Sequence, residues 1–458
     1  MMTNRSTQVD PLAPGVEQFA DSPGSALAQA QVSPLQILTL VLCFFVVAAD
    51  GFDVASVAFV GPLLQKTWAL SPAELGPLFG AALVGLTVGS FLFGPLADRI
   101  GRKRVITISL VLFGIGSLAC GYAPSARWLL YLRFATGLGL GGAMPNAITL
   151  SSEFSPSRGR ATMVTLMFCG FTAGLAFGGA IASVLIPAFG WRGVFVFGGL
   201  FPLCLAPCVW IWLPESLHFM AGKPRFECES RRTLARLTGD PDMPLQRAFP
   251  EETKLPTVSR SATSVLFDRH YRAGTLLLWF AFFCTLWVYY QLASWLPTVL
   301  ADAGSDAVRA ARLGAMLPLG GTIGALINAR LMDKINPFVV LAGSYAVAAV
   351  SITLIGFSLD GPALLYLTVF MAGLGLSGAQ TGANVVVASF YTTAARATGV
   401  SWALGVGRLG SIVGALTGGP LLMAVHSPQS AFIVFAIPAV LAGVAMAANG
   451  YLYRADTA

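Results

Sequence analysis

Two carboxylates, Asp50 and Asp53, lie inside an apolar run that covers residues 35–60. At helical spacing they are i and i+3, so both project from one face of a helix and can share one cavity. Gly51 between them either weakens the helix or allows another helix to approach closely. A carboxylate at bilayer depth is costly unless something binds it. We therefore expect a proton or substrate site; the alternative is a structural lock with backbone groups or a basic residue.

Arg133 is one of two arginines that the predicted topology places within the membrane. It follows Arg127 by six residues, about 9 Å below the outer end of its helix. Asp50 and Asp53 lie roughly 10–15 Å below the outer end of theirs, so the three residues can meet. An arginine beside the acids favours their ionised form, whereas burial favours the neutral form. Because a proton carrier must be balanced between the two, we assign proton coupling to Asp50, Asp53 and Arg133.

Arg408 is the second arginine, and its depth is different. It lies twelve residues beyond Arg396 on an outward-running segment, about 18 Å above the inner face and close to the middle of the bilayer. Gly405, Gly407 and Gly410 around it leave room for a ligand or a partner helix. A guanidinium binds a carboxylate through two parallel hydrogen bonds. We interpret Arg408 as the site for a substrate anion; the alternative is pairing with a buried acid, and the neighbouring segments offer none at this depth.

A cavity for an aromatic ring needs flat apolar surfaces and a few hydrogen-bonding groups. The seventh apolar segment places Trp287, Tyr290 and Gln291 near one face. The alternative to substrate binding for Trp287 and Tyr290 is a position at the membrane interface, where Trp and Tyr are enriched. Trp295 is interpreted mainly as an anchor at that interface. Three further polar residues at membrane depth are candidates for substrate binding or for hydrogen bonds between helices: Asn146, Gln380 and Asn384.

Composition indicates the scaffold that must position these residues. Hydrophobic residues make up 55% of the 458-residue chain and charged residues 11%, and the mean hydropathy is +0.73. Charged residues make up about 25% of soluble proteins. A spanning helix needs about 20 apolar residues. Such segments fall at roughly 35–60, 73–97, 104–121, 128–150, 162–188, 191–213, 273–298, 308–330, 337–357, 363–388, 397–424 and 429–452. We expect an all-α membrane protein with twelve transmembrane helices.

The distribution of basic residues predicts the orientation. With both termini in the cytoplasm, 21 of the 28 Lys and Arg residues lie on the inner side and only two, Arg133 and Arg408, lie within the membrane. The remaining five lie on the outer side: Lys66, Arg127, Arg192, Arg309 and Arg312. The positive-inside rule therefore selects cytoplasmic termini, and the net charge of +7 does not require a nucleic-acid partner. The polar N-terminal residues lack the features of a cleaved signal peptide.

An internal repeat divides the chain into two halves. Residues 137–143 match residues 373–379, and residues 160–162 match residues 396–398, both at an offset of 236. Six helices separate the copies, so they have the same orientation, and a substrate cavity is expected between the halves. The predicted divisions are a cytoplasmic tail at 1–34, a six-helix bundle at 35–213, a cytoplasmic central loop at 214–272, a second bundle at 273–452 and a cytoplasmic tail at 453–458.

A glycine-rich helix end followed by a basic turn, at residues 94–103, has a degenerate counterpart at 329–334. The first copy resembles the loop signature of the major facilitator superfamily, in which an acid and a basic cluster lock the cytoplasmic side. The resemblance implies gating roles for Gly94, Asp98, Arg99, Gly101, Arg102 and Asp333. Three charged residues at inner helix ends are further gating candidates, with surface ion pairs as the alternative: Glu153, Arg160 and Arg396.

Further motifs resemble the aromatic acid/proton symporter branch of this superfamily. They are the paired acids at 50–53, the stretch 133–139, Glu153 before 158–160, and the glycine-flanked arginine at 405–410. The stretch 214–218 departs from the sugar-porter pattern, which weakens a sugar assignment. The resemblance implies uptake of a hydroxybenzoate-type acid with protons across a bacterial inner membrane, in the service of aromatic catabolism.

The sequence lacks the residue patterns that metal binding, nucleotide binding or enzyme catalysis would need. Six of the seven cysteines lie in apolar segments, and His218, His270 and His426 form no ligand cluster. No GxxxxGK[ST] phosphate loop is present, and no nucleophile has a base at a sensible spacing. We therefore expect no enzyme activity, metal, cofactor or obligate protein partner; the partners are the substrate, protons and the lipid bilayer. The alternatives are a proton-coupled exporter of drugs or metabolites, and an aromatic-acid receptor with little net flux.

Overall fold

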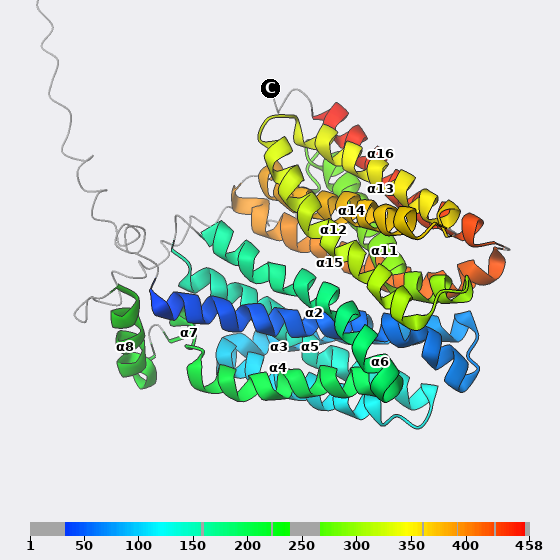
Figure 1. Cartoon of the computed structure of the whole chain (residues 1–458). Helices are drawn as coiled ribbons and strands as arrows, with labels where there is room; N and C mark the ends of the chain where they lie inside the picture. Colours follow the sequence, from blue (N-terminus) through cyan, green and yellow to red (C-terminus); the bar gives the residue numbers. More distant parts are fainter. Residues whose placement is uncertain are drawn as a thin grey trace, which may run out of the picture.

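The computed structural model describes residues 33–156, 160–220, 223–238, 266–359, 361–391, 393–425 and 427–453. They form two helical bundles joined by a polar connection (Figure 1). The first bundle contains α2 (Pro34–Trp68), α3 (Pro72–Ile100), α4 (Arg102–Gly121), α5 (Ala126–Phe154) and α6 (Arg160–Trp212). The second contains α11 (Arg272–Asp302), α12 (Ala307–Met332), α13 (Pro337–Phe357), α14 (Pro362–Phe390), α15 (Thr393–Ala424) and α16 (Pro428–Leu452). The connection includes α7 (Leu217–Met220), η2 (Pro224–Phe226) and α8 (Glu227–Thr238).

The described residues contain twelve helical segments long enough to cross a membrane. Ten are long and apolar enough to span a bilayer by length and composition. One of these, α6, contains two legs, because Gly190 adopts φ 66° and ψ −168° and turns the chain there. The twelfth is α5, whose 29 residues are long enough to span although glycine and polar residues lower its hydropathy. The predicted all-α fold is therefore confirmed.

The sequence repeat is also a repeat of helix packing. A Cβ atom at Gly137 of α5 would collide with the Ala82 carbonyl of α3, and one at Gly373 of α14 would collide with the Leu317 carbonyl of α12. Glycine lets the two backbones touch at both places. The same sequence motif therefore joins two helices in each half.

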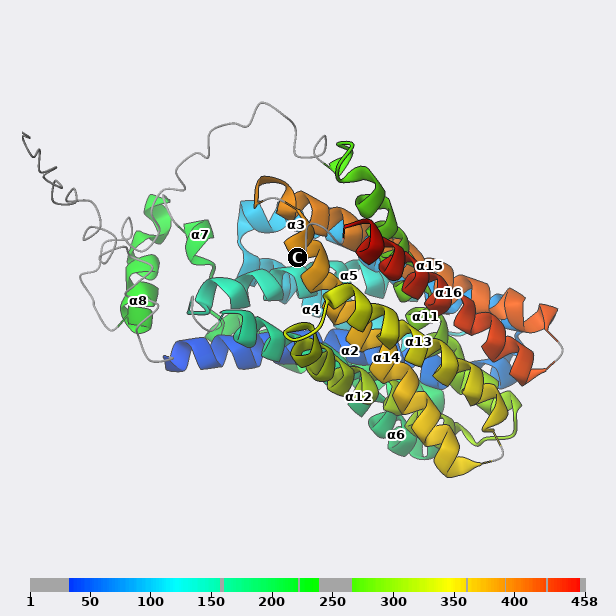
Figure 2. The same ribbon diagram turned by 90° about the horizontal axis from the view of Figure 1, so that it is seen from above.

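The two bundles contact each other near their outer ends. Gly61 of α2 lies against Thr298 of α11, and Gly419 of α15 lies against the Pro72 carbonyl of α3. Both views place α7 and α8 beyond the opposite end, where the bundles diverge (Figures 1 and 2). At that inner end the side chain of Phe91 on α3 is 77% exposed. The two bundles therefore touch at the end that the predicted orientation places outside, and they diverge at the end that it places inside (Figure 1).

Trp295 belongs to this outer closure, so its interpretation as an interface anchor is wrong. Its side chain is 0% exposed, and its indole Nε1 donates to the Ala415 carbonyl of α15 at 2.9 Å. Its ring meets the Phe79 ring of α3 edge-on, with centroids 5.0 Å apart. An indole buried between two bundles has no contact with the lipid headgroups, and it seals the contact between the halves instead.

Candidate functional site

Asp53 and Arg133 form a buried ion pair between α2 and α5. One guanidinium nitrogen, Nη1, donates to both carboxylate oxygens of Asp53, at 3.0 and 2.9 Å. Nη2 donates to the Asp53 backbone carbonyl at 3.4 Å, and the guanidinium lies 5.8 Å from the centre of the Phe195 ring. The side chains are 0% and 1% exposed. The structure thus brings Arg133 to one of the two acids, as the helix depths predict.

Asp50 lies one turn before Asp53 and has a different environment. It is 1% exposed, and neither of its carboxylate oxygens has a hydrogen-bond partner among the described residues. Helix α2 continues without a break through Gly51, where a Cβ atom would collide with the Phe171 carbonyl of α6. Gly51 therefore serves close helix packing and does not interrupt the helix. The two acids share a helix face but not a partner.

Arg408 of α15 is the charged group that acts most strongly on Asp50, ahead of Asp53. It also acts on the Tyr290 hydroxyl of α11, as does Asp50. Arg408 is half-buried, and it forms no ion pair within 4 Å in the part of the chain that the structure describes. An acid from the first half and an arginine and a tyrosine from the second half therefore approach one another across the interface.

The glycines around Arg408 were expected to leave room for a partner helix or for a ligand, and the structure contains both situations. Gly407 lies against Phe282 and Leu286 of α11, and a Cβ at Gly410 would collide with the Phe283 carbonyl of the same helix. These two glycines therefore allow helix packing. Gly405, one turn closer to the inner side, has open space where a Cβ would stand.

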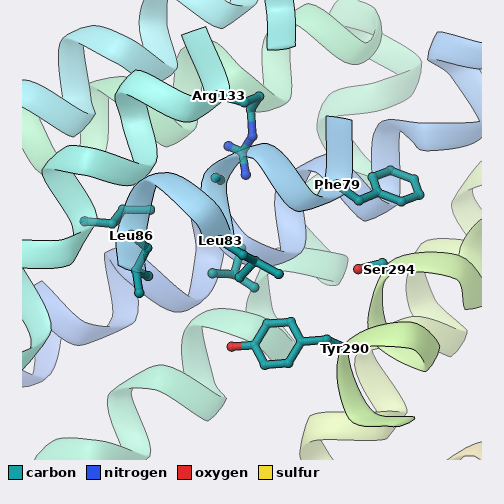
Figure 3. Close-up of a pocket in the computed structure, with 9 residues that line it drawn as sticks. Phe79, Leu83, Leu86, Arg133, Tyr290 and Ser294 are labelled. Atoms are coloured by element: carbon teal, nitrogen blue, oxygen red, sulfur yellow. The ribbon is translucent and has the colours of Figure 1, made fainter. Parts of the chain in front are cut away.

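A small cavity lies between the halves beside these groups (Figure 3). Arg133 and Tyr290 point toward it from different helices, and Ser294 of α11 adds a hydroxyl. The rest of its lining is apolar: Val54, Phe79, Ala82, Leu83, Leu86 and Leu140. Water can occupy only about 10 Å³ of it, whereas ligand pockets hold about 300 Å³ or more. In this conformation the contacts between the bundles leave no room in this cavity for a ligand.

The remaining candidates for substrate binding differ in what their polar atoms contact. Asn146 Nδ2 donates to the Gly142 carbonyl of its own helix at 2.7 Å, and Asn384 is exposed. Other buried polar atoms have no hydrogen-bond partner among the described residues: Trp287 Nε1, Gln291 Nε2 and Oε1, and Gln380 Oε1. Buried polar groups are normally paired, so these three side chains are the better candidates to bind a ligand.

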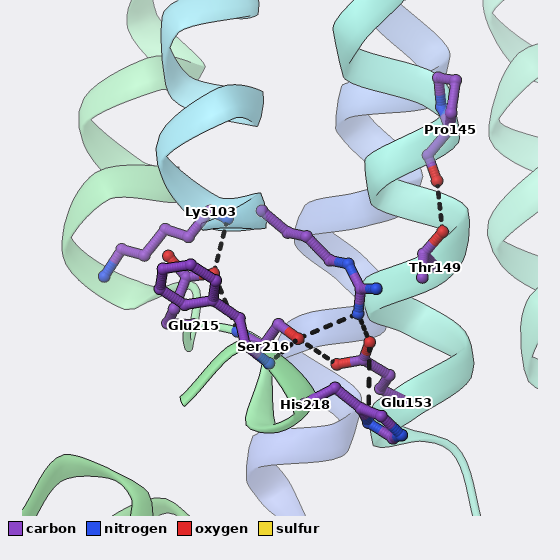
Figure 4. A network of polar contacts seen from close by, with 9 residues as sticks. Lys103, Pro145, Thr149, Glu153, Glu215, Ser216 and His218 are labelled. Carbon is purple, nitrogen blue, oxygen red and sulfur yellow. Dashed lines mark hydrogen bonds and ion pairs between the residues drawn. The ribbon is translucent and has the colours of Figure 1, made fainter. Parts of the chain in front are cut away.

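A polar network joins α4, α5 and the chain after α6 at the inner end (Figure 4). Arg102 pairs with Glu153, and its Nη1 donates to Ser216 Oγ at 3.0 Å. Ser216 Oγ donates to Glu153 Oε2 at 2.6 Å. Glu215 Oε1 accepts from the backbone N–H groups of Lys103, at 3.1 Å, and Ser216, at 2.9 Å. The network joins the first bundle to the start of the connection, and these contacts include no residue of the second bundle.

Glu215 and Ser216 are functional candidates that the sequence analysis missed. Their signal is the sequence Pro214-Glu215-Ser216 at the end of an apolar segment, on the same side as the basic turn at 101–104. Gly101 lets the Glu215 carboxylate lie close to the backbone of the basic turn. Its φ of +104° favours glycine, and a Cβ there would collide with the Glu215 carboxylate.

The other gating candidates form no ion pair or hydrogen bond with this network among the described residues, although the Asp98 carboxylate acts on the Arg102 guanidinium from a greater distance. The exposed residues are Asp98, Arg99, Asp333 and Arg396, and Gly94 has open space where a Cβ would stand. The side chain of Arg160 lies outside the described residues. The structure therefore joins Arg102 to Glu153 and leaves the residues on the open inner surface separate.

Comparisons with known proteins agree with this architecture. The Major Facilitator Superfamily pattern matches residues 43–414. The chain is 41% identical to the 4-hydroxybenzoate transporter PcaK of Pseudomonas aeruginosa over 447 residues, which cover 97% of this chain and 99% of that protein. It is 41% identical to a gallate transporter of Pseudomonas putida over 420 residues, which cover 92% and 93%.

Solved structures show the same fold at low sequence identity. A bacterial homologue of the human lysosomal transporter Spinster, inward-facing and unoccupied, matches with a TM-score of 0.73 at 17% identity, covering 92% of this chain and 98% of that one. The xylose transporter XylE from Escherichia coli, partially occluded and inward-open, matches with a TM-score of 0.70 at 14% identity, covering 90% and 97%. The chain is a multi-pass membrane protein that belongs to the major facilitator superfamily, in the branch that includes the 4-hydroxybenzoate and gallate transporters.

Proposed function

We propose that this protein imports an aromatic carboxylic acid of the hydroxybenzoate type across the bacterial inner membrane, by symport with protons. The observation that carries the proposal is Arg408, a half-buried guanidinium inside the membrane without an ion-pair partner within 4 Å among the described residues. A guanidinium in this setting favours a planar anion. Transporters of 4-hydroxybenzoate and gallate at about 40% identity support the same substrate class.

In this proposal the substrate enters between the halves with its carboxylate toward Arg408. Tyr290 and Trp287 offer aromatic surfaces to the ring. The unpaired amide of Gln291 and the unpaired Oε1 of Gln380 can bind ring hydroxyls. The acids of α2, together with Arg133, couple proton binding to this step. Binding energy then favours rearrangement of the two halves around the occupied site.

The gating residues act on the inner side as the halves rock. In the open state Asp98 and Arg99 are exposed at the end of α3, and Asp333 and Arg396 are exposed in the second half. We propose that closure of the inner side brings these groups together. The Arg102 and Glu153 pair holds the first half rigid during the change. The stretch 214–272 connects the halves in the cytoplasm.

Uptake into proteoliposomes tests the function. Labelled 4-hydroxybenzoate, gallate and benzoate are supplied with an inward proton gradient, which a protonophore then collapses. We expect gradient-dependent accumulation of at least one acid, and a loss of roughly 10- to 100-fold in uptake for Arg408→Ala, from the loss of charged hydrogen bonds. Arg408→Lys keeps the positive charge but lacks the planar guanidinium, so its uptake should lie between that of the wild type and that of Arg408→Ala. Arg231→Ala is the matched control, because Arg231 is exposed and, among the described residues, forms an ion pair only with the exposed Glu227.

Three outcomes would overturn the proposal. Accumulation of a cationic compound in exchange for protons, with no response to carboxylates, would identify an exporter. Binding of the acids without accumulation would identify a receptor. Equal loss in Arg408→Ala and Arg231→Ala would remove Arg408 from the substrate site.

A further inference from the structure

The two acids of α2 have different partners, and from this difference we infer that they have different functions. We propose that Asp50 alone binds the transported proton, and that its carboxylate and the substrate carboxylate are alternative partners of Arg408. Asp53 serves as the fixed partner of Arg133. This inference rests on the proposed function and assigns its proton step to one side chain.

Asp53 is unsuited to release and bind a proton during transport. Its two oxygens both accept from Arg133 Nη1, at 3.0 and 2.9 Å, and both side chains are almost completely buried. Protonating Asp53 would leave the Arg133 guanidinium as an uncompensated buried charge, which proteins strongly disfavour. The pair also links α2 to α5 within one half, so it need not separate when the halves move.

Asp50 has the opposite properties. Its oxygens accept no hydrogen bond among the described residues although the side chain is 1% exposed, so its charge is stabilised only from a distance. Taking up a proton removes the cost of that charge. Its strongest charged neighbour, Arg408, belongs to the other half, so this interaction changes whenever the halves move.

The groups that face Asp50 from each packed element are few. Asp53 lies on its own helix and is neutralised by Arg133 of α5. Tyr290 faces it from α11 and Arg408 from α15. Helix α6 presents the Phe171 carbonyl beside Gly51, and Arg192, the one charged residue between 162 and 212, lies at the outer bend. Arg408 is therefore the cation that an ionised Asp50 and a bound carboxylate must share.

This sharing gives a coupling rule. An ionised Asp50 competes with the substrate for Arg408, whereas a protonated Asp50 leaves Arg408 to the substrate. Substrate therefore binds together with a proton and leaves together with it. One proton accompanies one monoanion, so the transported charge is zero and the membrane potential does not drive the step.

Proton uptake during substrate binding tests the assignment directly. Purified protein in weak buffer receives 4-hydroxybenzoate, a pH-sensitive dye reports protons taken up, and calorimetry counts bound ligand. We expect about one proton per bound acid in the wild type above the pH at which Asp50 titrates, and none in Asp50→Asn. The affinity of the wild type should fall about tenfold per pH unit in that range, while Asp50→Asn shows a flat pH profile.

Asp53→Asn can fail to fold because it leaves Arg133 unpaired, so the matched variant is the double substitution Asp53→Asn with Arg133→Gln. Because Arg133 lines the cavity, the double variant is expected to bind 4-hydroxybenzoate more weakly. We expect it to take up about one proton per bound acid, as the wild type does. Proton uptake that persists in Asp50→Asn, or disappears in the folded double variant, would overturn the inference. A wild type that binds none of the acids would instead overturn the proposed function, so the two failures are distinguishable.

Discussion

The contact between α3 and α15 should control which side of the protein is open. A Cβ atom at Gly76 of α3 would stand 2.9 Å from the Leu416 carbonyl oxygen of α15, and backbone atoms cannot rotate away. Overpacking of this kind costs about 1–3 kcal/mol. The cost applies only while the outer side is closed, because the two helices belong to different halves. Gly76→Ala should therefore raise the ratio of outward-open to inward-open molecules roughly 5- to 150-fold.

A cysteine in place of Thr298 can report this change. Thr298 is 0% exposed at the outer contact and should become accessible only when that contact opens. The exposed cysteines Cys204 and Cys228 are replaced by serine, and labelling by a membrane-impermeant maleimide is followed from the outside. Gly343→Ala is the matched control, because Gly343 lies in α13 with open space where its Cβ would stand. Labelling of Gly76→Ala no faster than that of Gly343→Ala would refute the reasoning.

Three further predictions concern stability and are read from thermal unfolding in detergent. Asp53→Asn should lose about 3–5 kcal/mol, and adding Arg133→Gln should recover most of this loss; equal stability of the single and double variants would contradict a buried pair. Gly51→Ala should destabilise by about 1–3 kcal/mol through the Phe171 carbonyl, whereas Gly343→Ala should have little effect. Ser216→Ala should lose about 1–3 kcal/mol because Glu153 and Arg102 lose a buried partner, and an unchanged unfolding temperature would argue against the network.

Residue counting along helices located the central charges well. The rise per residue placed Arg133 and Asp53 at similar depths, and the structure joins them, because a helix inside a membrane leaves little freedom along its axis. The sequence predicts less well how each helix is rotated about its own axis and which tertiary contacts its side chains make. Trp295 looked like an interface anchor by composition, yet its neighbours on α3 and α15 bury it completely. The network of Glu215 and Ser216 depends on the chain folding back after α6, which no periodicity in the sequence predicts.

The internal repeat shows which residues of the candidate site occur in only one half of the chain. At the offset of 236, Gly137 corresponds to Gly373, and both glycines pack their helix against a neighbour in the same way. At the same offset Arg133 corresponds to the fully buried Val369. Arg408 corresponds to Thr172, whose hydroxyl donates to a carbonyl of its own helix at 3.0 Å. The packing motifs are thus shared, while each central arginine exists in only one half.

This asymmetry fits a transporter that must treat two ions differently. If the same charged residues occurred in both halves, two equivalent sites would face each other across one cavity. Neither site would then favour the proton over the anion. Here the first half holds both carboxylates and a buried arginine that already neutralises one of them. The second half supplies the remaining cation, Arg408, to the interface. Because the unneutralised acid and this cation belong to different halves, movement of the halves changes their interaction. In the proposed symport, this change links the occupancy of the site by proton and anion to the side that is open.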